Sequence, residues 1–133
     1  MSKWSHVDGT IKCNNLEGLE KIISEQKHYE KPWKYYENPY CSLKGSEGDV
    51  CFRRNGNELL ISGDLRDVDR ISEDRESIIE DFMKIIDTVE GQGYIEIEYE
   101  SEGTIVVDYY GEYDCRVFPK ADGWNKYYKN VKK

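Results

Sequence analysis

Hydrophobic and polar residues alternate strictly over residues 94–100, which predicts a β-strand with one face toward a core and the other toward solvent. Two isoleucines and a tyrosine occupy the positions that would point inward. The positions that would point outward are Glu96, Glu98 and Glu100. The pattern therefore predicts a row of carboxylates on a solvent-facing surface of a sheet.

Further extended runs flank turn signals on both sides of this strand. Asn55-Gly56 separates two of them, and Asn-Gly is the strongest short-range hairpin signal because both residues accept positive φ. Ser101-Glu102-Gly103 supplies another turn, so a hairpin and then a three-stranded meander are expected. The predicted runs are residues 3–13, 50–54, 58–62, 104–110 and 113–118.

A long amphipathic helix is predicted over residues 73–89, where apolar residues recur three and four positions apart. Acidic residues crowd its first turn, where the helix dipole favours negative charge. Ser72 is placed to cap its start, and Gly91 or Gly93 to end it.

The order of elements predicts an α+β fold. A shorter helix should follow a cap at Asn14 or Asn15, with an apolar stripe made by Leu16, Leu19, Ile22 and Ile23. The chain then reads strand, helix, two strands, helix and three strands. We expect a single domain over residues 1–133, with one antiparallel sheet of five to six strands and both helices on one face.

An aromatic stretch without regular periodicity runs from Gln26 to Glu47 and contains Pro32 and Pro39. Prolines exclude a continuous helix, and an unstructured loop of this length in a compact domain is itself a hint of function. Its tyrosines and Trp33 either fix the loop onto the domain as a satellite core or form a ligand or partner surface.

Charge is distributed unevenly around the formal net value of −8. Residues 119–133 hold five lysines against Asp122, about +4, which leaves about −12 on residues 1–118. The stretch 64–114 alone carries about −13. Such a surface repels nucleic acid and attracts basic proteins, so direct binding to duplex DNA is not expected. The tail 119–133 would be a basic, aromatic appendage.

The sequence favours neither catalysis nor a resident cofactor or metal. Neither of the two histidines has a nucleophile or orienting acid at a spacing that indicates a hydrolase, and His6 is expected to be structural. Asp64, Asp67 and Asp69 lack the spacing of a calcium loop. The four cysteines lie far apart and are expected to be buried thiols. No segment has the length of a membrane span, so we expect a soluble cytoplasmic protein.

The outward glutamates are the leading candidate for a partner-binding surface. Alternate strand residues advance about 6.6 to 7 Å, which is comparable to the phosphate spacing along a nucleic-acid strand. A row of carboxylates at this spacing can imitate a phosphate backbone, although a solvated strand face often carries glutamate for solubility alone. The predicted partner-binding residues are Glu96, Glu98, Glu100, Glu102 and Asp108.

An anion or nucleotide site is the competing candidate. The loop Gly45-Ser46-Glu47-Gly48 could offer backbone amides to a phosphate, with an arginine completing the site. Aromatic side chains of the stretch before it could stack on a base. The alternative is a plain connecting turn, with the arginines paired to neighbouring aspartates. The candidate residues are Ser46, Arg53, Arg66, Arg70, Trp33 and Tyr36.

Three motifs resemble those of a family of small phage and prophage proteins. They are Trp4-Ser5-His6-Val7-Asp8-Gly9-Thr10-Ile11, Gly45-Ser46-Glu47-Gly48 and Gly63-Asp64-Leu65-Arg66-Asp67, in matching order over the N-terminal two thirds. The resemblance implies a mobile-element accessory protein acting in the host cytoplasm, where such proteins often inhibit host defence.

That resemblance and the acidic row together lead to a hypothesis of function. The protein would be a non-enzymatic inhibitor whose acidic sheet face occupies the cationic nucleic-acid groove of a CRISPR effector or similar immune protein. A sponge for a nucleotide immune signal is the first alternative, and a structural or regulatory phage protein is the second.

Overall fold

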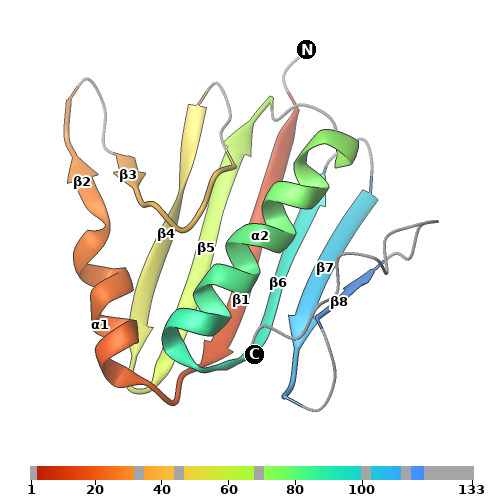
Figure 1. Cartoon of the computed structure of the whole chain (residues 1–133). Coiled ribbons are helices and arrows are strands. Elements are labelled where there is room, and N and C mark those ends of the chain that lie inside the picture. The colour runs from red at the N-terminus through yellow and green to blue at the C-terminus, as the bar shows by residue number, and fades with distance from the viewer. Residues whose placement is uncertain are drawn as a thin grey trace.

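A six-stranded antiparallel sheet forms the body of the fold, with its strands in the order β4-β5-β1-β6-β7-β8 (Figure 1). In this computed structural model the described residues are 3–31, 35–43, 47–67, 71–99, 103–111 and 115–118. The elements are β1 (Trp4–Lys12), α1 (Leu16–Glu25), β2 (Lys27–Tyr29), β3 (Tyr35–Glu37), β4 (Glu47–Asn55), β5 (Glu58–Arg66), α2 (Ile71–Val89), β6 (Gln92–Tyr99), β7 (Gly103–Tyr109) and β8 (Arg116–Phe118).

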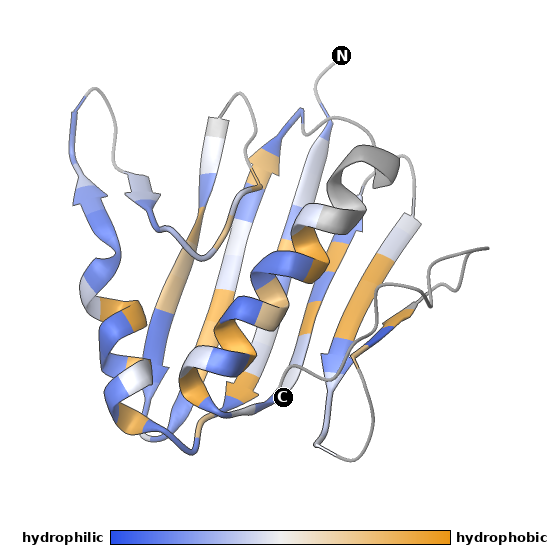
Figure 2. Ribbon diagram, in the orientation of Figure 1, coloured by the Kyte–Doolittle hydropathy of each residue, from blue (hydrophilic) through white to orange (hydrophobic). Residues whose placement is uncertain are grey.

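Both helices cover the same face of this sheet, which confirms the predicted α+β class (Figure 1). α2 crosses the middle of the sheet with its apolar side inward, and α1 lies beside β4 (Figure 2). Alternate residues of the strands meet the helices in one core, as the period-two pattern predicts. Fully buried members include Ile11, Ile61, Ile97, Phe82 and Ile86.

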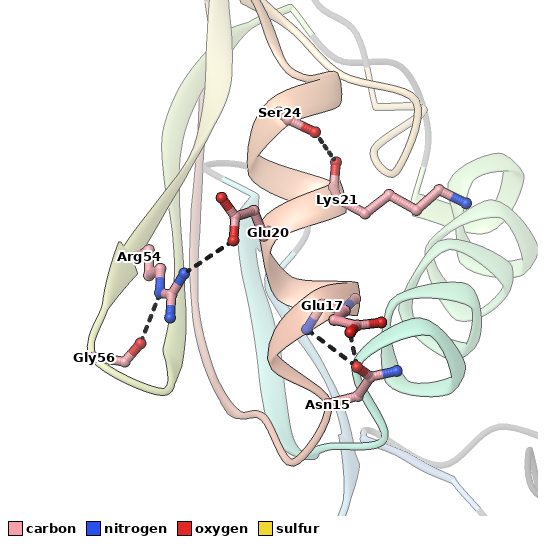
Figure 3. Close-up of polar contacts among 8 residues, drawn as sticks. Asn15, Glu17, Glu20, Lys21, Ser24, Arg54 and Gly56 are labelled. Carbon is pink, nitrogen blue, oxygen red and sulfur yellow. Dashed lines mark hydrogen bonds and ion pairs between the residues drawn. The ribbon is translucent and has the colours of Figure 1, made fainter.

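The end of one helix caps the start of the other. Asn15 is the N-cap of α1, and its side-chain oxygen accepts hydrogen bonds from the backbone amides of Glu17 and Gly18 at 3.1 Å each (Figure 3). The backbone amides of Asn14 and Asn15 donate to the carbonyl of Val89 at 3.1 and 2.8 Å. Of the two predicted caps, Asn15 therefore caps α1, while both residues satisfy the last carbonyls of α2.

The boundaries of α2 differ from the prediction at both ends. The helix begins at Ile71, so Ser72 lies within its first turn and is not its cap. At the other end the residue after Val89 is Glu90, which takes the left-handed conformation with φ of 48°. The expected glycine serves close packing instead, because a Cβ on Gly91 would lie 2.6 Å from the carbonyl oxygen of Lys12.

The Asn-Gly hairpin is confirmed, and its strands are longer than predicted. β4 and β5 meet at a turn in which Gly56 has φ of 62°. The second strand continues past Ser62 as far as Arg66. Gly63 therefore allows a close approach within the strand, since a Cβ there would lie 2.1 Å from the carbonyl oxygen of Asp49.

The aromatic stretch, predicted as an irregular loop, contains a small two-stranded sheet formed by β2 and β3. Two cross-strand aromatic pairs stabilise it: His28 stacks on Tyr36 and Tyr29 on Tyr35, with ring centroids 4.7 and 4.8 Å apart. Tyr40, only 3% exposed, belongs to the main core. The end of the stretch thus fixes the loop to the domain, while its hairpin stays partly exposed.

Side-chain amides satisfy the outer edge of β4. Gln26 donates from Nε2 to the carbonyl of Phe52 at 3.1 Å and accepts through Oε1 from the amide of Phe52 at 2.7 Å. Asn38 donates from Nδ2 to the carbonyl of Val50 at 3.3 Å. These bonds occupy backbone groups that an edge strand otherwise leaves to solvent.

We expect Asn15→Ala to lower the free energy of unfolding by about 1 to 2 kcal/mol, the usual cost of removing a helix N-cap. The variant loses the bonds to the first turn of α1 and a side-chain bond to the carbonyl of Thr88. Chemical denaturation of both proteins measures the difference. Ser24→Ala, on the exposed side of the same helix, is the control and should change stability by less than about 0.5 kcal/mol; equal effects of the two substitutions would contradict the capping role.

Candidate functional site

The sheet face opposite the helices, here called the open face, is covered by neither α1 nor α2 (Figure 1). Its centre is polar because the outward positions of β5, β1 and β6 face one another in register. One row across these strands is Asp64, His6 and Glu98. The next row is Ser62, Asp8 and Glu96.

Four carboxylates surround His6 at this centre, and we call Asp8, Asp64, Glu96 and Glu98 the acidic patch. Neighbouring strands lie about 4.8 Å apart, so side chains that share a row are within contact range. Three members are exposed, and Glu96 is partly exposed. Among the described side chains, neither row contains a lysine or arginine between β4 and β7. The negative charge of the patch is therefore compensated only through His6.

His6 and Asp64 form the one direct polar contact within the patch that has a defined distance, 2.8 Å from Nδ1 to Oδ1. Their side chains are 55% and 63% exposed, so solvent and ligands reach both. The hydrogen bond to Asp64 raises the pKa of His6 above its usual value, and the charges of Asp64, Asp8 and Glu98 act in the same direction, against a small desolvation effect. The His6 ring is thus held toward its charged form.

Two of the three sequence motifs build this patch together. Trp4-Ser5-His6-Val7 pairs residue by residue with Gly63-Asp64-Leu65-Arg66 in the β1–β5 ladder. Within these segments Val7 and Leu65 enter the core, whereas His6 and Asp64 face outward. Gly48, the last residue of the third motif, lies opposite Leu65 on β4. The resemblance to the phage family therefore involves segments that are adjacent in space.

Asp67, at the end of the third motif along the chain, has a structural role. Its backbone has φ of 53°, a conformation that aspartate tolerates better than most residues. Its amide donates to the carbonyl of Lys3 at 2.6 Å, and its Oδ1 accepts from the amide of Lys3 at 2.9 Å. The Arg66 guanidinium also approaches Asp67, with Nε 3.6 Å from Oδ2. These contacts join the start of β1 to the end of β5, as the predicted Asp-Arg pairing at this junction implied.

Of the predicted acidic residues, only Glu96 and Glu98 lie in the acidic patch. Glu100 and Glu102 fall outside the described residues. Asp108 shares their face but is only 10% exposed at its side chain, and it accepts two hydrogen bonds of 3.0 Å from the Arg116 guanidinium. A carboxylate paired in this forked geometry is neutralised, so we remove Asp108 from the candidate surface.

The candidate anion site is not assembled by its described members. Arg53 and Arg66 both face the open side, but Arg53 pairs with Leu60, six positions from Arg66 along β5. At about 3.3 Å per residue they are roughly 20 Å apart, too far to bind one phosphate. Tyr36 stacks on His28, and its amide donates to Asp49. Ser46, Arg70 and Trp33 lie outside the described residues.

Sequence reasoning missed Asp8, Asp64 and His6 as members of the surface. Their positions depend on β1 lying between β5 and β6, which brings residues 58 positions apart into contact. The available signal was the alternation in the first motif, which puts His6 and Asp8 on the same side of a strand.

The thiols and the metal-ligand residues do not form a second site in the described part of the chain. The four cysteines are free, and burial raises the pKa of Cys13 to about 11 and that of Cys41 to about 12. No three described His, Cys, Asp or Glu side chains are grouped to hold a metal ion. No described helix combines the length and apolar character needed to cross a membrane.

No protein-family model, curated protein or solved structure matches this chain. The site is therefore interpreted from its own geometry and chemistry.

We expect Asp64→Asn to lower the pKa of His6 toward its ordinary value of 6.5, because the main cause of the upward shift is removed. A raised folded-state pKa stabilises the fold fully below the unfolded-state pKa, and this contribution is lost as the pH rises through the folded-state pKa. The stability difference between wild type and variant should thus be larger at pH 6 than at pH 8. NMR titration of the His6 ring measures the pKa directly. Asp87→Asn on the exposed side of α2 is the control, and a His6 pKa that follows both substitutions equally would contradict the pair.

Proposed function

We propose that this protein is a non-enzymatic binding protein whose acidic patch occupies a cationic, nucleic-acid-binding surface of a partner protein. The observation that supports this proposal is the grouping of Asp8, Asp64, Glu96 and Glu98 on an open sheet face, in two adjacent rows. Charge of one sign on a rigid surface steers and selects a partner of opposite sign.

The arrangement of the patch matches a phosphate backbone in two directions. Glu96 and Glu98 are alternate residues of β6, about 6.6 to 7 Å apart along the strand. Asp64 and Asp8 extend the charge across β5 and β1, so the patch is a surface rather than a single line. A groove lined by lysine and arginine that binds phosphates would meet carboxylates at comparable spacing.

The rigidity of the surface supports recognition. Its carboxylates are on the central strands of a six-stranded sheet, whose opposite side is the buried core. Side chains on such strands lose little backbone freedom when a partner binds, which lowers the entropic cost of association. A solvated surface selected only for solubility has no need to gather its acids around one histidine.

The resemblance to phage and prophage proteins suggests which partner to test first. Under this proposal the protein acts in the host cytoplasm on an immune effector that binds nucleic acid, and it competes with that nucleic acid for one groove. The nucleotide-sponge alternative receives no comparable support, because Arg53 and Arg66 are at opposite ends of the open face.

We expect the double variant Glu96→Lys/Glu98→Lys to weaken partner binding at least about tenfold, since it removes two charge contacts of up to about 1 kcal/mol each and adds repulsion. The tagged full chain is used to capture partners from a bacterial host lysate, and duplex DNA or RNA is then added as competitor. Captured protein should be released by nucleic acid and be lost with the double variant.

The matched control is Glu80→Lys/Asp87→Lys, which makes the same charge change on exposed positions of α2. This control should retain the partner. Capture that survives the change at Glu96 and Glu98, or that nucleic acid does not displace, would overturn the proposal. Circular dichroism of both double variants verifies that each remains folded.

A further inference from the structure

The chain leaves the sheet beside the acidic patch. β8 pairs with β7 so that Phe118, its last residue, lies opposite Val106. Val106 in turn lies opposite Glu96, and Glu96 opposite Asp8. The strand therefore delivers the chain to the level of the patch, two strands away from Glu96.

The segment that follows has the opposite charge. Residues 119–133 contain five lysines and one aspartate, whereas the patch contains four carboxylates and one histidine. The segment also contains Trp124, Tyr127 and Tyr128. Residues 119–133 lie outside the described residues, so their location is inferred from charge and connectivity alone.

Distance allows the segment to reach the whole patch. Strand spacing of about 4.8 Å puts β6 about 10 Å and β5 about 19 Å from β8. Fifteen residues span up to roughly 50 Å when extended and about 22 Å as a helix. Either conformation can bring lysines over Glu96 and Asp8.

The open face also offers apolar contacts next to the patch. Leu60, Tyr94 and Val106 point to this side and are partly exposed. Aromatic side chains interspersed with lysines can pack on such residues while their charged neighbours pair with carboxylates. The chemistry of the surface thus matches both components of the segment.

We propose that residues 119–133 dock across the acidic patch of their own chain and must leave it before a cationic partner binds. A tethered segment has an effective concentration in the millimolar range, so it is favoured over a second copy of the chain at micromolar protein. The docking itself needs no external partner, whereas its regulatory consequence rests on the proposed function.

Zero-length carbodiimide crosslinking of the full chain tests the docking, because it joins a lysine to a carboxylate only when the two form a contact. We expect mass spectrometry to find lysines of residues 119–133 linked to Asp8, Asp64, Glu96 or Glu98, with yields that fall several-fold at high salt. Glu80 and Asp87 on α2 are exposed reference carboxylates. Links formed equally with these two residues would overturn the docking.

A mixture of unlabelled and ¹⁵N-labelled protein separates links within a chain from links between chains. Links confined to one isotopic species support docking in the same chain. Mixed-isotope links as the main product would assign the surface to a second copy and overturn the proposal as stated.

The regulatory part is tested by affinity for an octalysine peptide. Lys126→Gln/Lys129→Gln/Lys132→Gln should bind the peptide at least about fivefold more tightly than Lys21→Gln/Lys27→Gln/Lys31→Gln. The second triple variant makes the same net charge change at exposed positions of α1, β2 and the residues after β2. Equal affinities would overturn the regulation. Failure of every form to bind octalysine would instead count against the proposed function, while the crosslinks decide the docking.

Discussion

The register of β1 between β5 and β6 is the constraint on which the rest of the molecule depends. A slip by one residue would move Val7 and Ile11 to the open face and put His6 and Asp8 into the core. Close backbone approach helps to fix the register: a Cβ on Gly9 would lie 2.6 Å from the carbonyl oxygen of Tyr94. The two ends of β1 are tied as well, by Asp67 to Lys3 at one end and by the bond of 2.8 Å from the amide of Cys13 to the carbonyl of Asn57 at the other.

The helices depend on the same strand through the residues that follow it. Directly after β1, Asn14 and Asn15 bond to the last carbonyls of α2, and Asn15 then starts α1. Gly18 allows the two helices to touch, since a Cβ there would lie 2.0 Å from the carbonyl oxygen of Thr88. The helix layer is thereby locked to one side of the sheet, and the acidic patch is left on the other.

Elements with strong local signals could be predicted from the sequence, and features set by long-range pairing could not. The alternation of residues 94–100, the apolar stripe of α2 and the Asn-Gly turn depend on neighbours along the chain, and all three are present. The β2–β3 pair is three residues per strand, too short for a periodicity to emerge. Asp108 seemed available because its pairing with Arg116 depends on the β7–β8 register, and His6 seemed structural because its partner is 58 positions away.

The amide of Gln26 affects how this sheet can associate with other chains. By donating to and accepting from the backbone of Phe52, it imitates one residue of a neighbouring strand. An incoming extended peptide finds those groups already occupied, and the bond from Asn38 to Val50 blocks the adjacent position. Over residues 50–52 the β4 edge is therefore protected from β-augmentation and from the edge-to-edge stacking that leads to aggregates. Partners are directed to the face of the sheet instead.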